Sequence, residues 1–123
     1  MQRAVLLVDH GSRRTEANAQ LEALAAQLRE KLPDRNVVTA HLELLPPSVA
    51  DGIDLCVARG AREIVIHPFF LAPGRHSTED LPRHARDGAL RHPNVAIRVG
   101  PILGLHPALV EAVLARIGEA GEP

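Results

Sequence analysis

Histidine and carboxylate side chains stand in short polar segments that follow apolar runs. His10 comes directly after the run AVLLV and Asp9, His76 closes the loop after EIVIHPFFL, and Glu43 lies two residues beyond His41. Neutral imidazole is a good ligand for divalent Fe, Co, Ni, Cu and Zn, and its ordinary pKa of about 6.5 also suits proton transfer. Two histidines and a carboxylate can therefore hold a divalent metal with open positions, or accept protons.

Arginines accompany these histidines. Planar, permanently charged guanidinium groups bind carboxylates or phosphates, although exposed arginines can equally be solvated. The arginines in question are Arg13, Arg14, Arg75 and Arg83. Gly11 and Gly74 stand beside them, and a residue without a Cβ lets the backbone approach a ligand closely.

The remaining histidines have plainer interpretations. His41 either lines the site or packs half-buried, and His67, before a proline in an apolar strand, has a structural role. His84 and His92 have the spacing of solvated helix surfaces. His106, before Pro107, starts a helix, and whether it also faces the site is left open.

Two further side chains carry information. Glu43 interrupts an apolar strand end, and burying a lone carboxylate is costly, so we expect a function or a salt bridge for it. Cys56 should pack on its helix. As the only cysteine, it excludes a disulfide framework and a cysteine-rich zinc site.

Short apolar runs and helical periodicities alternate along the chain and predict β-α-β-α-β-α-β-α. The predicted strands are 4–8, 37–45, 63–71 (ending or bending near Pro68) and 95–99. The predicted helices are 18–32, about 48–60, about 77–91 and one that opens at His106-Pro107. Ser48 and Ser77, each followed three residues later by aspartate, resemble capping-box starts.

Apolar residues at helical spacing define the faces that should be buried. The first helix presents Leu21, Leu24, Ala25, Leu28 and Leu32, and the second presents Ile53, Cys56 and Val57. The last helix is predicted to have a core face made of Leu109, Val110, Val113, Leu114 and Ile117.

This alternation predicts an α/β fold with a four-stranded, mostly parallel sheet between helices on both faces, in three layers. We expect the 123 residues to form a single domain, 1–123, without linker or repeat. Ligands of open α/β sheets bind beyond the carboxyl ends of the strands, which is where His10, Glu43 and His76 fall.

Composition excludes several partners. Fourteen basic against fifteen acidic residues give a net charge of −1, and the chain has no Trp or Tyr, so nucleic acid and anionic membranes are not expected. The first apolar run has only five residues before Asp9, too few for a signal peptide or membrane span. We expect a cytoplasmic protein.

Four motifs in order resemble the short form of the sirohydrochlorin chelatase family, the small cobalt-chelatase type of class II tetrapyrrole chelatases. They are Val8-x-His10-Gly11-Ser12-Arg13 with Asn18, Leu42-Glu43-x-x-x-Pro47-Ser48, the segment Pro68–His76 continuing Ser77-x-x-Asp80-Leu81-Pro82, and Gly104-x-His106-Pro107. The resemblance covers nearly the whole chain. It implies the flavodoxin-like half of a class II chelatase.

The resemblance also implies an activity: insertion of Co²⁺, Fe²⁺ or Ni²⁺ into sirohydrochlorin, on routes to cobalamin or sirohaem. His10 and His76 would handle the metal, with Glu43 as ligand or base, and the metal would be a substrate rather than a permanent cofactor. Gly11, Ser12, Arg13, Gly74 and Arg75 would bind the tetrapyrrole and its carboxylates. A single half should form a homodimer with the two rims facing each other.

Two rival interpretations remain. A non-catalytic delivery protein would use the same ligands to bind metal or tetrapyrrole and hand it on. A histidine phosphatase shares the His-Gly pair, but Asp9 stands where that class has a phosphate-binding arginine. A plain flavodoxin-like binding domain lacks support because no Ser/Thr/Gly-rich phosphate loop follows the first strand.

Overall fold

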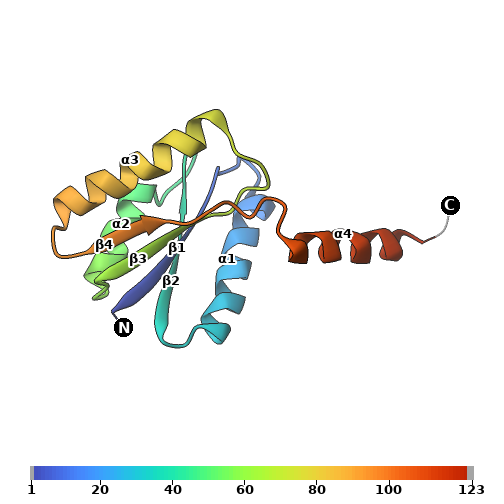
Figure 1. Cartoon of the computed structure of the whole chain (residues 1–123), viewed down its shortest axis with the longest axis horizontal. Helices are drawn as coiled ribbons and strands as arrows, with labels where there is room; N and C mark the ends of the chain where they lie inside the picture. Colours follow the sequence, from blue (N-terminus) through green and yellow to red (C-terminus); the bar gives the residue numbers. More distant parts are fainter. Residues whose placement is uncertain (1, 122–123) are drawn as a thin grey trace.

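Four parallel strands form the centre of the molecule (Figure 1). The computed structural model describes residues 2–121, apart from the side chains of residues 75–78. The sheet order is β2-β1-β3-β4, and each adjacent pair is parallel, which confirms the predicted α/β class. The strands are β1 (Arg3–Asp9), β2 (Arg35–His41), β3 (Glu63–Pro68) and β4 (Ala96–Val99). The helices are α1 (Thr15–Lys31), α2 (Val49–Ala58), α3 (Arg75–Arg91) and α4 (Pro107–Ala120).

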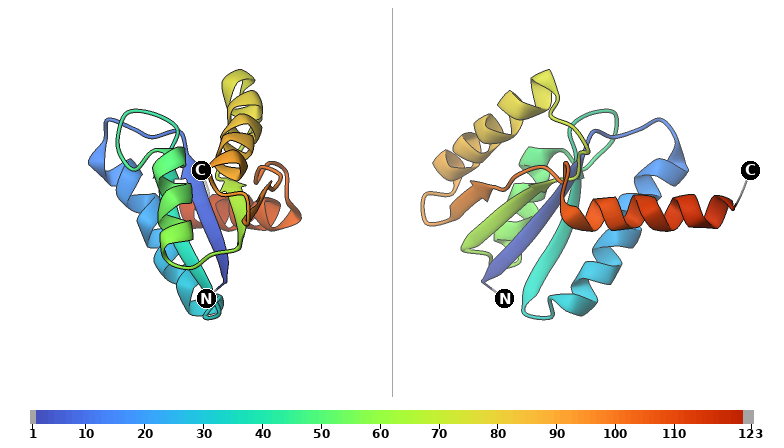
Figure 2. Two further views of the ribbon diagram at one scale, coloured as in Figure 1. Left: turned by 90° about the vertical axis from the view of Figure 1, so that its left-hand side faces the viewer. Right: turned by 45° about the vertical axis from the view of Figure 1, so that its right-hand side comes forward.

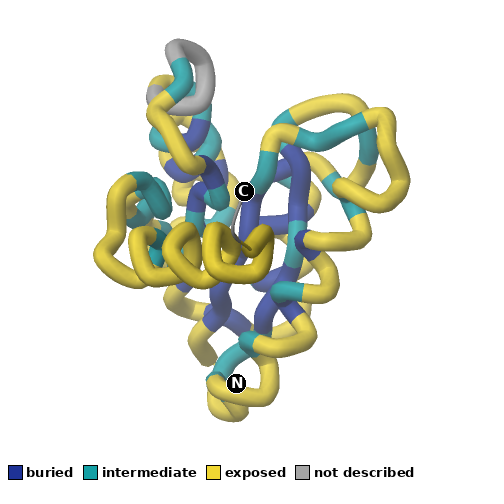
Figure 3. The backbone as a smooth tube through the Cα atoms, turned by 90° about the vertical axis from the view of Figure 1, so that its right-hand side faces the viewer, coloured by how far each residue is buried: buried dark blue, intermediate teal, exposed yellow. Residues whose placement is uncertain are grey.

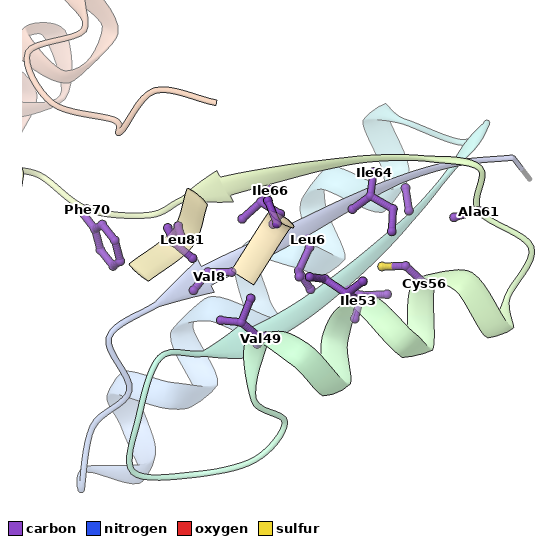
Figure 4. Close-up of a cluster of buried hydrophobic side chains, with 14 residues drawn as sticks. Leu6, Val8, Val49, Ile53, Cys56, Ala61, Ile64, Ile66, Phe70 and Leu81 are labelled. Atoms are coloured by element: carbon purple, nitrogen blue, oxygen red, sulfur yellow. The ribbon is translucent and has the colours of Figure 1, made fainter. Parts of the chain in front are cut away.

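Two hydrophobic clusters hold helices against opposite faces of the sheet. The larger joins β1, β2 and β3 to α2 and α3 through Ile53, Leu81 and their neighbours (Figure 4). The smaller joins Val5, Leu7 and Val37 to α1. Leu21 and Ala25 of α1 are buried there, and the other three leucines of the predicted stripe are partly buried, so that stripe is confirmed. The sheet therefore lies between helices on both of its faces, which gives the three predicted layers.

Element ends differ from the prediction by a few residues. Strand β2 ends at His41 rather than residue 45, and the chain then returns along its open side, where the His41 N–H donates to the carbonyl of Pro47 at 2.9 Å. Strand β3 ends at Pro68, as its missing donor predicts. Helix α2 begins as predicted, since the Ser48 hydroxyl accepts from the Asp51 N–H at 3.1 Å. Helices α1 and α3 begin slightly earlier, at Thr15 and Arg75.

The predicted core face of the last helix is wrong. None of the residues of α4 is buried, and the helix projects away from the sheet (Figures 1 and 2). Its residues are exposed apart from half-buried Leu109 (Figure 3). The apolar periodicity correctly predicts an amphipathic helix, but periodicity does not specify which surface that helix contacts. Within residues 2–121, no helix is long and apolar enough to cross a membrane.

Half-buried His67 makes the stability of the fold sensitive to acid. Burial lowers the pKa of this imidazole, so the unfolded chain takes up a proton more readily than the folded one. We therefore expect the free energy of unfolding to fall as the pH drops below about 6.5, the ordinary histidine pKa. His67→Gln should flatten this fall in urea denaturation series at neutral and mildly acidic pH. Equal pH slopes for the two proteins would contradict the assignment.

Candidate active site

The carboxyl ends of β1, β2 and β3 bring three polar segments side by side. Asp9 is the register partner of His41, and Val8 is the partner of Pro68. Beyond the strands the backbone stays paired, because the Glu43 N–H donates to the His10 carbonyl at 3.0 Å. The segments containing His10 and Glu43 therefore lie at one edge of the sheet, as the strand-end rule predicts.

A hydrogen-bonded pair of side chains lies under this edge. His41 Nδ1 is 2.5 Å from Asp9 Oδ1, and the side chains are only 7% and 18% exposed. The same carboxylate oxygen accepts the Gly11 N–H at 3.0 Å. His41 is therefore buried. Of the two predictions for this residue, packing in the interior is confirmed and lining of the site is not. One carboxylate fixes both the end of β2 and the turn that carries His10.

Gly11 meets a strict requirement of this turn. Its φ is +89°, and an ideal Cβ at this position would lie 2.0 Å from the Glu43 carbonyl oxygen. The close approach predicted at Gly11 is thus made by the chain's own second loop. Only glycine allows the loops after β1 and β2 to come together here.

Ser12 and Asn18 close the same loop. The Asn18 amide accepts from the Ser12 N–H at 3.0 Å and donates to the Ser12 carbonyl at 2.7 Å. The Ser12 hydroxyl accepts from the Arg14 N–H at 3.0 Å. The loop is thus ordered by its own polar groups, and Arg13 and Arg14 are left exposed at the rim.

His10 is exposed and rests on an aromatic ring. Its imidazole stacks on Phe70, with centroids 4.3 Å apart and planes inclined by 27°. Phe70 is buried, and its carbonyl accepts the Gly104 N–H at 3.3 Å. The ring beneath His10 therefore restricts the orientation of the imidazole while its outer side remains open to a ligand.

Glu43 has a different setting from the one predicted. It lies beyond the end of β2 and is exposed, so the prediction that Glu43 is a buried carboxylate at a strand end is wrong. An exposed carboxylate beside the His10 loop can still bind a cation or accept a proton. Its backbone is held by the bond to the His10 carbonyl.

The third predicted segment is described only through its backbone. Gly74 is half-buried, and α3 begins at the next residue. The side chains of Arg75 and His76, both predicted site residues, lie outside the described residues, as does that of Ser77. Among the side chains that are described, no three His, Cys, Asp or Glu residues converge into a metal site. The set His10, Glu43 and His76 stays a prediction.

Three other titratable side chains have structural roles. His106 caps α4 by accepting the Ala108 N–H at 3.0 Å, as its predicted place at a helix start requires. His92, predicted to be solvated, instead lies 2.7 Å from Asp54 Oδ1, and this bond is the main cause of a lowered Asp54 pKa. Burial raises the pKa of Cys56 to about 11, which fits a packed, unreactive thiol.

Sequence reasoning missed Asp9 and Phe70 as parts of the site. The sequence interpretation gave Asp9 no place in the site and noted only that it stands where histidine phosphatases have a phosphate-binding arginine. A signal for its pairing was present, since Asp9 and His41 are polar residues at the ends of two buried strands. Phe69 and Phe70 are the only aromatic rings of the Phe, Tyr and Trp types in the chain, and both stand at a strand end.

Comparison with known proteins gives a consistent group. The model of the CbiX family matches residues 4–120. Sirohydrochlorin ferrochelatase, chloroplastic, of Arabidopsis thaliana is 41% identical over 113 residues, 92% of this chain and 50% of the relative. Sirohydrochlorin cobaltochelatase of Methanopyrus kandleri is 29% identical, over 95% of this chain and 96% of the relative.

A solved structure agrees over nearly the same span. The sirohydrochlorin chelatase SirB of Bacillus subtilis subspecies spizizenii, in complex with cobalt, superposes with a TM-score of 0.86 at 30% identity. It covers 97% of this chain and 51% of that one. The chain thus spans about half the length of several relatives that it matches and almost the full length of another.

Removing the Asp9 charge should destabilise the protein. Asp9→Asn weakens the bonds to His41 and to the Gly11 N–H in a largely buried place, at an expected cost of about 1–3 kcal/mol. Asp34→Asn is the matched control, because the Asp34–Arg3 ion pair is exposed and should contribute less than about 1 kcal/mol. Urea denaturation measures both. Equal losses in the free energy of unfolding would mean that the Asp9–His41 pair stabilises the protein no more than an exposed ion pair does.

Gly11 tolerates no side chain. Gly11→Ala adds a clash with the Glu43 carbonyl to the strain of a positive φ. Gly104→Ala is the control, since φ is +51° there but the nearest atom to the new Cβ is an ordinary 3.5 Å away. The control should lose about 1–2 kcal/mol from backbone strain, and Gly11→Ala clearly more. A smaller loss for Gly11→Ala, in the same denaturation assay, would refute the close approach of the two loops.

Proposed function

The chain belongs to the CbiX family, and from this premise we propose that it is a sirohydrochlorin chelatase, which inserts a divalent metal into sirohydrochlorin. The names of the chelatase relatives support the reaction, with Co²⁺ or Fe²⁺ as the metal. The observation that carries the proposal is the exposed His10 ring, stacked on Phe70 beside the Glu43 loop at the ligand-binding edge of the sheet.

In the proposed reaction the metal ion is a substrate. His10 and His76 bind the hydrated ion through imidazole nitrogens and displace part of its water. The pyrrole nitrogens of the tetrapyrrole then replace the remaining ligands. Four metal–nitrogen bonds form and two pyrrole N–H bonds break, so two protons must leave, and Glu43 or a histidine accepts them. The product is the metallated ring.

The surroundings of His10 fit this use. The Asp9 carboxylate and the Phe70 ring hold the backbone and the imidazole of His10, so little ordering remains to be done when a metal arrives. Arg13 and Arg75 would bind the carboxylates of the tetrapyrrole, with Ser12, Gly11 and Gly74 shaping the loops beneath it. Arg13 is exposed at the rim, as this role requires.

Two further proposals concern the protein as a whole. We infer that it acts as a homodimer, because a 13.3 kDa domain offers one open rim to a substrate large enough to cover it. We also infer a cytoplasmic location and no permanent cofactor, the metal being taken up and released as part of the product.

Replacement of His10 should reduce catalysis without affecting the fold. Anaerobic insertion of Co²⁺ into sirohydrochlorin is followed by visible absorption, with the protein-free rate subtracted. His10→Ala should lose about 10²-fold or more of the catalysed rate, because a metal ligand or proton acceptor is removed. His92→Ala is the matched control, since His92 lies at the opposite edge of the sheet beside Asp54 and should retain nearly full activity.

The outcomes of that experiment separate the rival functions. Equal rates for His10→Ala and His92→Ala would overturn the role of His10. Tight binding of metal or tetrapyrrole with no acceleration by the unaltered protein would favour a delivery protein. Metal-independent phosphatase activity that is lost in His10→Ala would favour the phosphatase interpretation.

A further inference from the structure

A cavity of about 320 Å³ lies against the outer edge of β2, close to the residue where this strand begins. The sheet order places β2 at one edge of the sheet, with β1 on a single side of it. The chain enters β2 from the end of α1, and the cavity is bordered by that connection (Figure 1). Arg59, at the end of α2, completes its border from the other face of the sheet.

This cavity is remote from the candidate active site. It borders Arg35, the first residue of β2, whereas His41, the last residue, is bonded to Asp9 beneath His10. At about 3.3 Å per residue, the two ends of this strand are about 20 Å apart. The cavity therefore lies at the opposite end of the sheet from the residues assigned to metal insertion.

Positive charge is concentrated around the cavity. Three of its lining residues are arginines, namely Arg29, Arg35 and Arg59, and none of the described lining residues is acidic. Arg29 is held in place by other groups: its Nε and Nη2 donate to the Val37 carbonyl at 3.1 and 2.8 Å, and its Nη1 pairs with Glu22 at 2.7 Å. The charge of Arg29 is therefore already balanced.

The other two guanidinium groups are not balanced in this way. Within the described part of the chain, neither Arg35 nor Arg59 has a carboxylate or hydrogen-bond partner for its side chain. The Arg35 Nε is buried without a partner. A buried donor that loses its hydration and gains no partner is costly, so this arrangement calls for an anion that offsets the cost.

The chemistry of the lining indicates the kind of anion. Planar guanidinium groups bind phosphate oxygens with paired hydrogen bonds. A phosphate monoester carries a charge of about −1.5 to −2 at neutral pH, which matches two unpaired arginines better than one carboxylate does. Leu32 and Pro33 add apolar surface, and the volume is within the range of small-molecule sites.

We propose that this cavity binds a small organic phosphate monoester. Its phosphate lies between Arg35 and Arg59, and its apolar part lies against Leu32 and Pro33. This binding site goes beyond the chelatase reaction and does not rest on it. The assays below contain neither metal nor tetrapyrrole, so their failure and the failure of the proposed reaction are distinguishable.

Nuclear magnetic resonance of the ¹⁵N-labelled chain gives the first test, with phenyl phosphate as the probe. Saturable shifts are expected at the Arg35 Nε–H and at the backbone N–H of Asn36, and no shift at the backbone N–H of His10. Shifts that do not saturate, or that spread evenly over the exposed arginines, would overturn the site.

Substitutions of single arginines test the assigned contacts. Arg35→Met and Arg59→Met should each raise the Kd for phenyl phosphate about tenfold or more, because each removes a charged donor. Arg86→Met is the matched control, since it removes the same charge from an exposed position on α3 and should change the Kd less than about twofold. Equal effects of all three substitutions would overturn the proposal.

Two further probes separate the parts of the ligand. Benzoate keeps an aromatic ring but carries a single charge, and inorganic phosphate lacks the apolar part. Both should bind more weakly than phenyl phosphate. Benzoate binding as tightly would overturn the preference for phosphate, and inorganic phosphate binding as tightly would overturn the role of Leu32 and Pro33.

Stability measurements distinguish a binding role of Arg35 from a structural one. Without ligand, Arg35→Met should be at least as stable as the unaltered protein in urea, because its guanidinium has no partner to lose. With phenyl phosphate at a concentration well above its Kd, the unaltered protein should gain more stability than the variant. A clear loss of stability in ligand-free Arg35→Met would show a structural role and contradict the proposal.

Discussion

The hydrogen-bonded contact of Asp9 with His41 organises the edge of the sheet on which the proposed chemistry depends. It joins the last residues of β1 and β2, and its carboxylate also holds the Gly11 N–H. The turn at Gly11 brings the second loop against the first, and His10 is left exposed between them on the Phe70 ring. A buried polar pair is costly unless its groups are satisfied, and here each hydrogen bond also positions a segment of the site.

The remaining features of the site follow from that constraint. The parallel register places the ends of β1, β2 and β3 together, so residues distant in sequence need only short loops to meet. Asn18 closes the first loop from α1, and Ser48 begins α2 just after the second. Burial of α1 and α2 against the sheet therefore stabilises both loops from below. Fold and site share the same contacts.

Much of this was predictable from local patterns. The apolar runs predicted the positions of the strands along the chain, and the stripe through Leu21 and Ala25 predicted the buried face of α1. The strand-end rule gave His10 and Glu43 as neighbours. These features depend on periodicity and topology, which a single sequence expresses directly.

Features that depend on tertiary contacts were not predictable in this way. The burial of His41 depends on Asp9, thirty-two residues away, and the exposure of Glu43 depends on where β2 ends. The apolar face of α4 was correctly recognised but wrongly assigned to the core of its own chain. Amphipathicity shows that a helix has an apolar face, but it does not specify which surface that face contacts.

The most direct test of the account is the insertion reaction of the unaltered protein. Sirohydrochlorin is mixed anaerobically with Co²⁺, Fe²⁺ or Ni²⁺, with and without the protein, and the visible spectrum is followed in time. The account predicts faster formation of the metallated spectrum with at least one of the three metals. Equal rates with and without folded protein for all three metals would contradict it.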